Sequence, residues 1–196
     1  MPTGVAIRDV REQLFDAAER VLMRDGAAAL TSRAVTTEAG CAKGVLHRHF
    51  ADFDAFLTDL VIDRAGRMEE RAAVLVAAAG TRTVVGLLTD ALTDLFTPVV
   101  VAMVGLLTFR DGLRARLRAA GRPGVTVLSD ATAMLRSYLE AERQAGRLAP
   151  DTDIDSLGLT LIGSGHLLYA NRDDGPPGEA DVRRIVTSAV AGALPR

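Results

Sequence analysis

The sequence predicts an all-α protein, and two observations carry this prediction. Apolar residues recur at spacings of three and four along most of the chain, which is the period of one face of a helix. No stretch shows the two-residue alternation, bounded by hairpin turns, that is typical of a half-buried strand. Glycine- and proline-containing breaks separate the apolar stretches and mark the expected helix ends.

Residues that favour caps and stops mark the helix ends in the first third of the chain. Gly26 and Gly40 supply left-handed turns that end the first two helices. Thr31 provides an N-cap hydroxyl for the second helix, and Asp52 or Asp54 provides a carboxylate that opens the fourth. The helices predicted in this part span residues 7–25, 32–39, 42–50 and 53–79.

Larger and more apolar helices are predicted in the remainder of the chain. The run "PVVVAMVGLL" at 98–107 is half of the roughly 20 residues that span a bilayer, so it is predicted to be a buried helix. The segments "AGRPG", "RLAPDTD" and "RDDGPPG" are turn-rich connections. The helices predicted in this part span residues 83–96, 98–108, 110–119, 125–145, 154–171 and 179–194.

Composition restricts the class of protein. Of the 196 residues, 48% are hydrophobic and 24% are charged, with both signs interspersed, which is typical of a globular protein with a sizeable core. The formal net charge of −2 argues against general coating of nucleic acid or of anionic membrane, so any DNA contact must come from a local basic patch. A single cysteine and the lack of an export signal predict a cytoplasmic protein without disulfides.

The stretch from residue 31 to residue 50 has the features of a helix-turn-helix. Two short helices joined by a glycine-containing turn, packed on a preceding amphipathic helix, make this motif, and its second helix can enter the DNA major groove. Arg33, Arg48 and the only lysine of the chain, Lys43, give the stretch a local excess of positive charge. Gly44 costs about 1 kcal/mol of helix stability relative to alanine, and close approach to a DNA backbone is one reason to accept that cost. The patch is suited to neutralising phosphates.

The same stretch resembles the TetR family of bacterial transcriptional repressors. The resembling residues are Thr31, Arg33, Val35, Ala39-Gly40, Lys43-Gly44, Leu46, Arg48-His49-Phe50 and, more weakly, "ADFDAFL" at 51–57. The resemblance covers about the first 60 residues. It implies an all-helical dimer with a DNA-binding domain, here residues 1–52, and a larger helical domain, here residues 53–196, that binds a small effector and dimerises. The DNA-binding residues predicted from the pattern and the resemblance are Thr31, Arg33, Ala42, Lys43, Gly44, Val45, His47 and Arg48.

Several positions depart from the usual family pattern. Ala42 stands where a hydroxyl residue usually opens the recognition helix, so that cap is missing. Val45 and His47 replace a frequent threonine and a frequent tyrosine, and as alternatives they are suited to a thymine methyl group and a phosphate. Asp52 and Asp54 occupy the region of a frequent lysine near the fourth helix. These departures put several of the family's phosphate contacts in question.

Neither a metal site nor a catalytic site is predicted. His47 and His49 are two residues apart, roughly 200° around a helix, so they do not present one ion-binding face. Cys41 is expected to pack inward and His49 to be half-buried. The chain contains no HExxH, GxSxG or phosphate-loop motif, so no cofactor and no enzymatic activity are expected.

Large and adaptable apolar side chains in the central helices predict a cavity for a small, mostly apolar effector. Ordinary core packing is the alternative for each of these residues. His166, between "GSG" and "LLY", is either the polar anchor of such a cavity or a satisfied core histidine. The predicted ligand-binding residues are Phe96, Met103, Phe109, Met134, Tyr138, His166 and Tyr169.

The last two helices predict a dimer interface. Helix 154–171 is apolar on two sides, so one side faces the core and the other is left for a partner subunit. Helix 179–194 has a single apolar stripe. A two-fold dimer of this kind places two recognition helices on a pseudo-palindromic site. The predicted interface residues are Leu159, Ile162, Gly163, Val182, Ile185, Val186 and Ala189.

These predictions together describe a homodimeric, ligand-responsive transcriptional regulator, a repressor by the family's usual mode. Its expected partners are a double-stranded DNA operator, a small-molecule effector and a second copy of the chain, with no membrane. Two alternatives remain: a DNA-binding regulator without an effector, and a helical enzyme that would rely on His166 with Asp155 or Asp174. The strong preference for arginine over lysine suggests a GC-rich bacterial genome.

Overall fold

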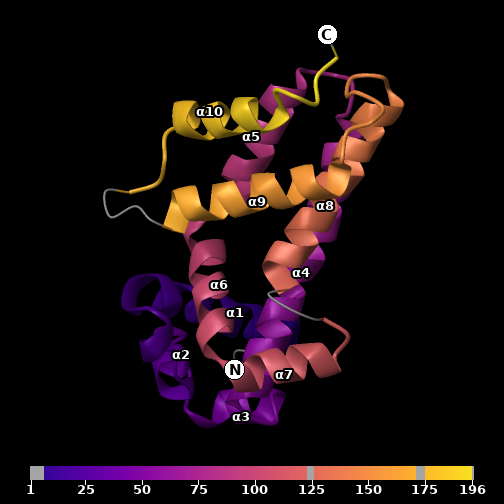
Figure 1. Ribbon diagram of the computed structural model, residues 1–196. Coiled ribbons are helices and arrows are strands. Elements are labelled where there is room, and N and C mark those ends of the chain that lie inside the picture. The colour runs from indigo at the N-terminus through magenta and orange to yellow at the C-terminus, as the bar shows by residue number, and fades with distance from the viewer. Residues whose placement is uncertain (1–6, 123–125, 171–174, 196) are drawn as a thin grey trace. The chain divides into compact units, whose positions relative to one another are not determined.

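The computed structural model describes most of the chain. The described residues are 7–122, 126–170 and 175–195. Every regular element within them is a helix, as the sequence predicts (Figure 1). The predicted helix start at Val125 and the predicted helix end at Asn171 lie outside the described residues.

The chain divides into two compact units. The first comprises Met1–Asp63 and Ala102–Val125, and the second comprises Arg64–Val101 and Thr126–Arg196. This division groups residues by their contacts, and its boundaries fall inside two helices. The sequence analysis instead predicts a boundary by function, between a DNA-binding domain that ends at residue 52 and an effector-binding domain that begins at residue 53. That boundary stays a prediction.

Several helices of the first unit begin or end at the residues that the sequence analysis singled out. The elements here are α1 (Ile7–Asp25), the 3-10 helix η1 (Ala27–Ala29), α2 (Ser32–Glu38), α3 (Gly44–His49), the start of α4 (Phe53–Ala77), the later part of α6 (Pro98–Phe109) and α7 (Asp111–Ala119). The Thr31 hydroxyl accepts a hydrogen bond from Ala34 N at 3.2 Å and caps α2. Asp52 Oδ1 accepts one from Ala55 N at 2.7 Å at the start of α4. Gly26, with φ of 80°, follows α1 in the left-handed conformation that glycine tolerates.

An aromatic cluster forms the centre of the first unit. The ring centroids of Phe50 and Phe56 are 5.0 Å apart, and Phe15 lies 6.0 Å from Phe50 and 5.6 Å from Phe56. All three side chains are almost completely buried. Phe15 belongs to α1, Phe50 follows α3 and Phe56 belongs to α4, so the cluster joins three helices around one core.

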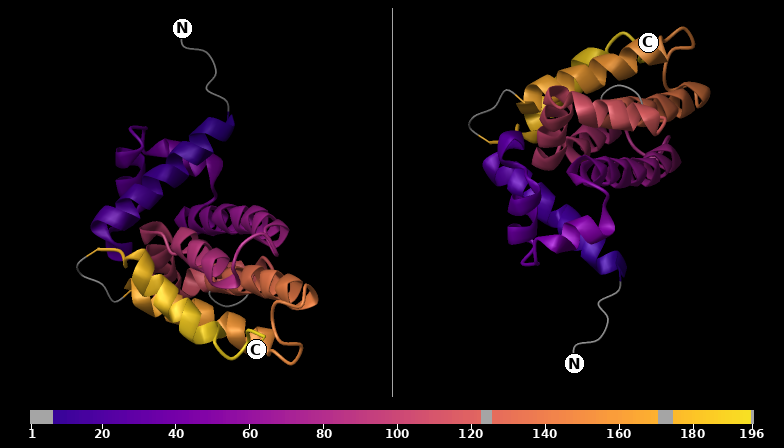
Figure 2. Two further views of the ribbon diagram at one scale, coloured as in Figure 1. Left: turned by 90° about the horizontal axis from the view of Figure 1, so that it is seen from above. Right: turned by 90° about the horizontal axis from the view of Figure 1, so that it is seen from below.

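The second unit is built from the later part of α4 and from larger helices. These are α5 (Val84–Leu95), the start of α6 (Pro98–Phe109), α8 (Thr126–Gln144), α9 (Ile154–Ala170) and α10 (Glu179–Val190). α10 packs on α5 and on α9, and α9 packs on α8; α9 and α10 lie side by side in Figures 1 and 2. α10 is shorter than predicted because the chain turns after Val190, where Ala193 O accepts a hydrogen bond from Ala149 N at 2.8 Å.

A buried carboxylate joins the end of α8 to the turn between α4 and α5. Glu142 has no solvent exposure. Its Oε1 accepts a hydrogen bond from Gly80 N at 3.3 Å, and its Oε2 lies 3.2 Å from Arg147 Nε. Burial, and then the neighbouring Glu142, raises the pKa of the Tyr138 hydroxyl above its ordinary value. A buried carboxylate is stable only when it is paired, so this cluster fixes the turn to α8.

Within the described residues, no single helix has both the length and the hydropathy of a membrane span. α5 and α6 reach these values only when taken together, across a sharp bend between them.

Candidate nucleic-acid interface and effector pocket

The second helix of the predicted helix-turn-helix is α3, and its apolar face holds it in the first unit. Leu46 is fully buried, and Phe50, which ends the helix, is 4% exposed. Side chains four residues apart lie on one face of a helix, so the opposite face of α3 is turned to solvent. α2 packs on both α1 and α3. The structure therefore confirms the predicted motif.

The predicted DNA-binding residues are accessible to solvent. Seven of the eight are exposed and one, Val45, is half-buried. The exposed ones are Thr31, Arg33, Ala42, Lys43, Gly44, His47 and Arg48. α3 has no side-chain N-cap, as Ala42 leads us to expect. The contacts of these residues with DNA stay predictions, and their exposure meets the first requirement for such contacts.

Two arginines that the sequence analysis did not single out pair with the one acidic residue of this stretch. Glu38 Oε1 accepts a hydrogen bond from Arg20 Nε at 2.8 Å, and Oε2 accepts one from Arg24 Nη1 at 2.8 Å. The bond from Arg24, and then that from Arg20, holds the pKa of Glu38 below its ordinary value. The carboxylate is thus paired, which weakens its repulsion of a phosphate backbone. The two arginines are four apart on α1, but only the fold brings them to α2.

Asp52 and Asp54, which stand near the position of the family's frequent lysine, are also bound by arginines. Asp52 Oδ2 accepts a hydrogen bond from Arg116 Nη2 at 2.7 Å, and Arg110 Nη1 lies 3.6 Å from Asp54 Oδ1. The hydrogen bond from Ala55 N, and then that from Arg116, lowers the pKa of Asp52. The two carboxylates therefore join the start of α4 to α7 within the first unit, Asp54 at the N-cap residue Arg110 and Asp52 in the last turn, and their negative charge is offset.

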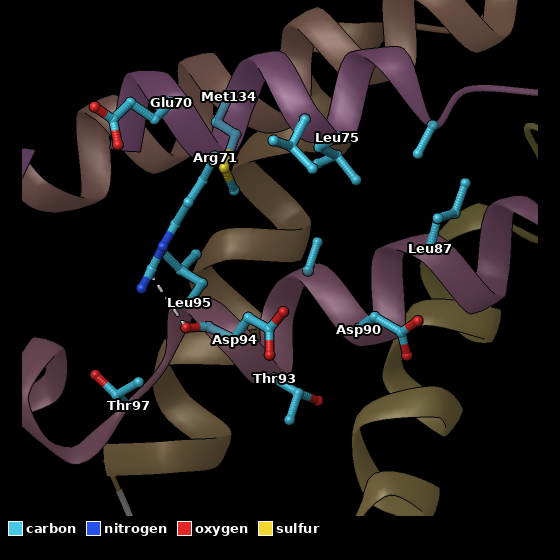
Figure 3. A pocket seen from close by; sticks show the side chains of 13 residues that line it. Glu70, Arg71, Leu75, Leu87, Asp90, Thr93, Asp94, Leu95, Thr97 and Met134 are labelled. Carbon is cyan, nitrogen blue, oxygen red and sulfur yellow. Dashed lines mark hydrogen bonds between the residues drawn. The ribbon is translucent and has the colours of Figure 1, made fainter. Parts of the chain in front are cut away.

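The second unit contains a pocket of about 700 Å³ between α4, α5 and α8 (Figure 3). Small and medium apolar side chains line its interior, and charged and hydroxyl side chains line its rim. The lining residues are Glu70, Arg71, Val74, Leu75, Ala78, Leu87, Asp90, Ala91, Thr93, Asp94, Leu95, Thr97 and Met134. This volume lies within the range of small-molecule sites, roughly 300–1,000 Å³.

Met134 is the one predicted ligand-binding residue that lines this pocket. Phe96, Met103 and Tyr138 are at most 1% exposed and belong to the core, which is the alternative that the sequence left open. Phe109 is 85% exposed, so nothing in its own unit encloses it. The sequence analysis chose large side chains as pocket candidates. In the structure the large side chains fill the core, and the pocket lies where smaller side chains leave space unfilled.

Phe96 packs against α9 in a tightly filled site. Its ring is stacked on that of Tyr169, with centroids 5.5 Å apart, and lies 6.1 Å from that of His166. A Cβ atom added to Gly165 would lie 2.5 Å from Phe96 Cε2, so the glycine makes room for the ring. Phe96, His166 and Tyr169 therefore pack on one another, as the core alternative predicts.

His166 is half-buried, and its Nδ1 is buried without a hydrogen-bond partner among the described residues. Burial lowers the pKa of this imidazole. Asp155, on the same helix, is about 16 Å away along the helix axis, and it pairs with Arg136 at 3.1 Å. His166 and Asp155 therefore form no catalytic pair. Asp174 lies outside the described residues.

The structure places three of the predicted dimer-interface residues in the core of the second unit. Ile162, Val182 and Val186 are 3%, 1% and 0% exposed. They are buried because α10 packs on α5 and α9 within the same chain. These three residues are therefore not part of the surface that is available to a partner subunit.

The remaining predicted interface residues reach the surface. Leu159 is 63% exposed, Gly163 is exposed, and Ile185 and Ala189 are half-buried. Leu167, which the sequence analysis did not single out, is 61% exposed and continues the same row of α9. Its spacing of four residues from Gly163 and eight from Leu159 could have indicated it.

These features define a helix-turn-helix protein with a separate pocket-bearing helical unit. Residues 14–66 match the family model described as "Bacterial regulatory proteins, tetR family". The N-terminal part of the chain thus matches this family, as the sequence analysis predicts. A comparison with curated protein sequences gives no match.

The whole fold is similar to that of solved regulators. The fatty acid degradation regulator FadR from Bacillus halodurans is 17% identical, with a TM-score of 0.73 over 97% of this chain and 98% of that one. FadR from Bacillus subtilis, solved with stearoyl-CoA, is 17% identical, with a TM-score of 0.71 over 92% and 98%. NalD, the secondary repressor of the MexAB-OprM efflux pump in Pseudomonas aeruginosa, is 14% identical, with a TM-score of 0.65 over 95% and 96%. At these identities the likeness shows the fold.

Proposed function

We propose that this protein is a cytosolic, ligand-responsive transcriptional repressor that binds a pseudo-palindromic operator as a homodimer. The observation that carries the proposal is the exposed cationic face of α3, anchored from behind by buried Leu46 and Phe50. A helix held in this way can enter a major groove while its core side keeps it rigid.

The exposed residues Lys43, His47 and Arg48 and the half-buried Val45 each have a role in this proposal. Lys43 and Arg48 neutralise phosphates, and Lys43 at the start of the helix is also in reach of base edges. His47 donates to a phosphate, and half-buried Val45 contacts a thymine methyl group. Thr31 and Arg33 add contacts to the DNA backbone from α2.

A dimer is proposed through the exposed row of α9. Leu159, Gly163 and Leu167 are four residues apart, so they lie on one face of the helix. Two large apolar side chains with a glycine between them permit close approach of the same helix from a second copy. A two-fold interface of this kind presents one recognition helix from each subunit.

The pocket supports a small-molecule effector over the alternative of a regulator without one, because that alternative predicts a filled core. FadR from Bacillus subtilis was solved with stearoyl-CoA, which shows that a protein of this fold accommodates a ligand. Effector binding against α4 is proposed to shift the population toward a conformation that does not match the operator. α4 is one continuous helix from Phe53 to Ala77, so it extends from the first unit to the pocket.

The proposal is tested by selecting sites from randomised duplex DNA with the purified protein. The selected sites are then titrated against salt with wild type and with the double variant Lys43→Ala, Arg48→Ala. The double variant Arg118→Ala, Arg183→Ala removes the same charge from exposed positions on α7 and α10 and serves as the control.

We expect a pseudo-palindromic site, bound less tightly as salt rises, that the α3 variant loses and the control retains. Losing two phosphate contacts per subunit also reduces the slope of log affinity against log salt by about two for each subunit. Enrichment of no sequence, or equal loss in both variants, would remove the basis for a sequence-specific regulator.

A further inference from the structure

The pocket of the second unit has an apolar floor that faces a charged rim. The floor residues are Leu75, Ala78, Leu87, Ala91, Leu95 and Met134, whereas Val74 is 71% exposed and lies at the edge. In Figure 3 the α4 and α5 walls face each other, and Arg71 reaches from α4 toward the end of α5. A ligand that fills this pocket therefore has an apolar part and meets charges at one end.

The charges on the rim are unbalanced. Three carboxylates, those of Glu70, Asp90 and Asp94, accompany one guanidinium, that of Arg71. Asp90 is paired with Arg82 Nη1 at 2.5 Å. The Glu70 and Asp94 carboxylates form no ion pair within the described residues, and Figure 3 shows the Glu70 carboxylate turned away from Arg71. The rim thus retains a negative charge that the protein does not neutralise.

Asp94 occupies an electrostatically unfavourable position. It lies in the last turn of α5, where the carbonyl groups carry the negative end of the helix dipole and where no basic residue of the helix compensates it. Asp90, four residues earlier, adds a like charge on the same face. Selection for stability alone favours a neutral or basic residue here, so a role in binding is a physical reason for the carboxylate.

Arg71 shows that this end of the pocket accepts a cation. Its Nη1 donates a hydrogen bond to the main-chain oxygen of Asp94 at 3.3 Å, not to the carboxylate. One long bond from an exposed side chain is weak. A ligand cation can therefore compete with the guanidinium for the carbonyl end of α5.

We propose that this pocket binds an apolar molecule that carries one positive charge, such as an alkyl amine or a quaternary ammonium compound. The cation lies by the Asp94 carboxylate and the carbonyl end of α5, and the apolar part covers the floor. An anion finds one favourable group, Arg71, and two unpaired carboxylates that repel it. The inference deepens the proposed ligand-responsive function and rests on it for its biological role.

The test is calorimetric titration of the full-length protein with three probes that share an eight-carbon chain: octyltrimethylammonium, octanol and octanoate. We expect the affinity to be highest for the ammonium probe and lowest for octanoate. Added salt should weaken binding of the ammonium probe and leave that of octanol unchanged.

Three variants identify the groups responsible. Asp94→Asn should lower the affinity for the ammonium probe about fivefold and leave that for octanol unchanged, because it removes one partly exposed ion pair. Arg71→Ala should raise the affinity for the ammonium probe by removing its competitor. Asp151→Asn, which removes the same charge from an exposed loop outside this pocket, should change neither affinity. Asp94→Asn should also retain or raise the melting temperature, which excludes misfolding as the cause.

Tightest binding of octanoate, with its loss in Arg71→Ala, would overturn the proposal and make Arg71 an anion anchor. Binding of none of the three probes by folded protein would overturn it as well. These titrations contain no DNA, so either result leaves the proposed operator binding standing. Conversely, the protein could select no DNA site and still bind the ammonium probe through Asp94. That result would refute the proposed function and support the proposed ligand of this pocket.

Discussion

The packing of Phe96 against α9 can be tested by adding a single methyl group. Gly165→Ala places a Cβ atom 2.5 Å from Phe96 Cε2 and 3.1 Å from Cδ2, where ordinary contact begins at 3.4 Å. The ring must retreat by roughly 1 Å, and it is fully buried and stacked on Tyr169. Overpacking of this kind costs about 1–3 kcal/mol.

Helix propensity acts in the opposite direction, so a matched variant is needed. Alanine in place of glycine in a helix interior stabilises by about 0.5–1 kcal/mol. Gly66→Ala in α4 provides this term alone, because no atom lies within 4 Å of its added Cβ. We expect Gly66→Ala to be more stable than wild type, and Gly165→Ala to be less stable than Gly66→Ala by the full overpacking term of about 1–3 kcal/mol.

The assay is urea unfolding of both variants and wild type, followed by circular dichroism at one protein concentration. The difference between the two variants isolates the contact with Phe96, since both share the change in propensity. Equal stability of Gly165→Ala and Gly66→Ala would refute the close packing and with it the assignment of Phe96 to the core rather than to an effector site.

Three further predictions follow from other parts of the fold. Leu159→Glu should convert a dimer to a monomer in sedimentation, whereas Met23→Glu, at an exposed apolar position of the first unit, should not; an unchanged dimer in both would refute the α9 interface. Glu142→Gln should destabilise the fold by about 1–3 kcal/mol because its carboxylate is fully buried, and Glu140→Gln, with a partly exposed pair, by less than about 1 kcal/mol, as measured by urea unfolding. Burial lowers the pKa of His166 below 6.5, so below this pH the unfolded state binds a proton that the folded imidazole does not. The free energy of unfolding should therefore fall as the pH drops below 6.5. In unfolding curves measured across pH, His166→Gln should reduce that fall.

Local features of this chain were predictable from its sequence. Thr31 and Asp52 cap helices, and Gly26 and Gly40 adopt the left-handed turns expected of them, because capping and backbone freedom involve only neighbouring residues. The exposed cationic face of α3 was predictable for the same reason. A six-residue helix with buried Leu46 leaves little choice for the side that faces outward.

The pocket and the partner surface were not predictable in the same way. Helices such as α9 are apolar on more than one side, and hydrophobicity alone does not say which side meets the core. Ile162 is buried and Leu159 is exposed because other helices cover one and not the other.

The amino-acid sequence by itself therefore determined the all-helical class, the helix ends and the helix-turn-helix, since these depend on contacts a few residues long. Only the tertiary structure decided which charges are neutralised, as with Asp52 and Arg116, which are 64 residues apart. It also decided where space remains for a ligand, because a pocket is what packing leaves unfilled between helices distant in the chain.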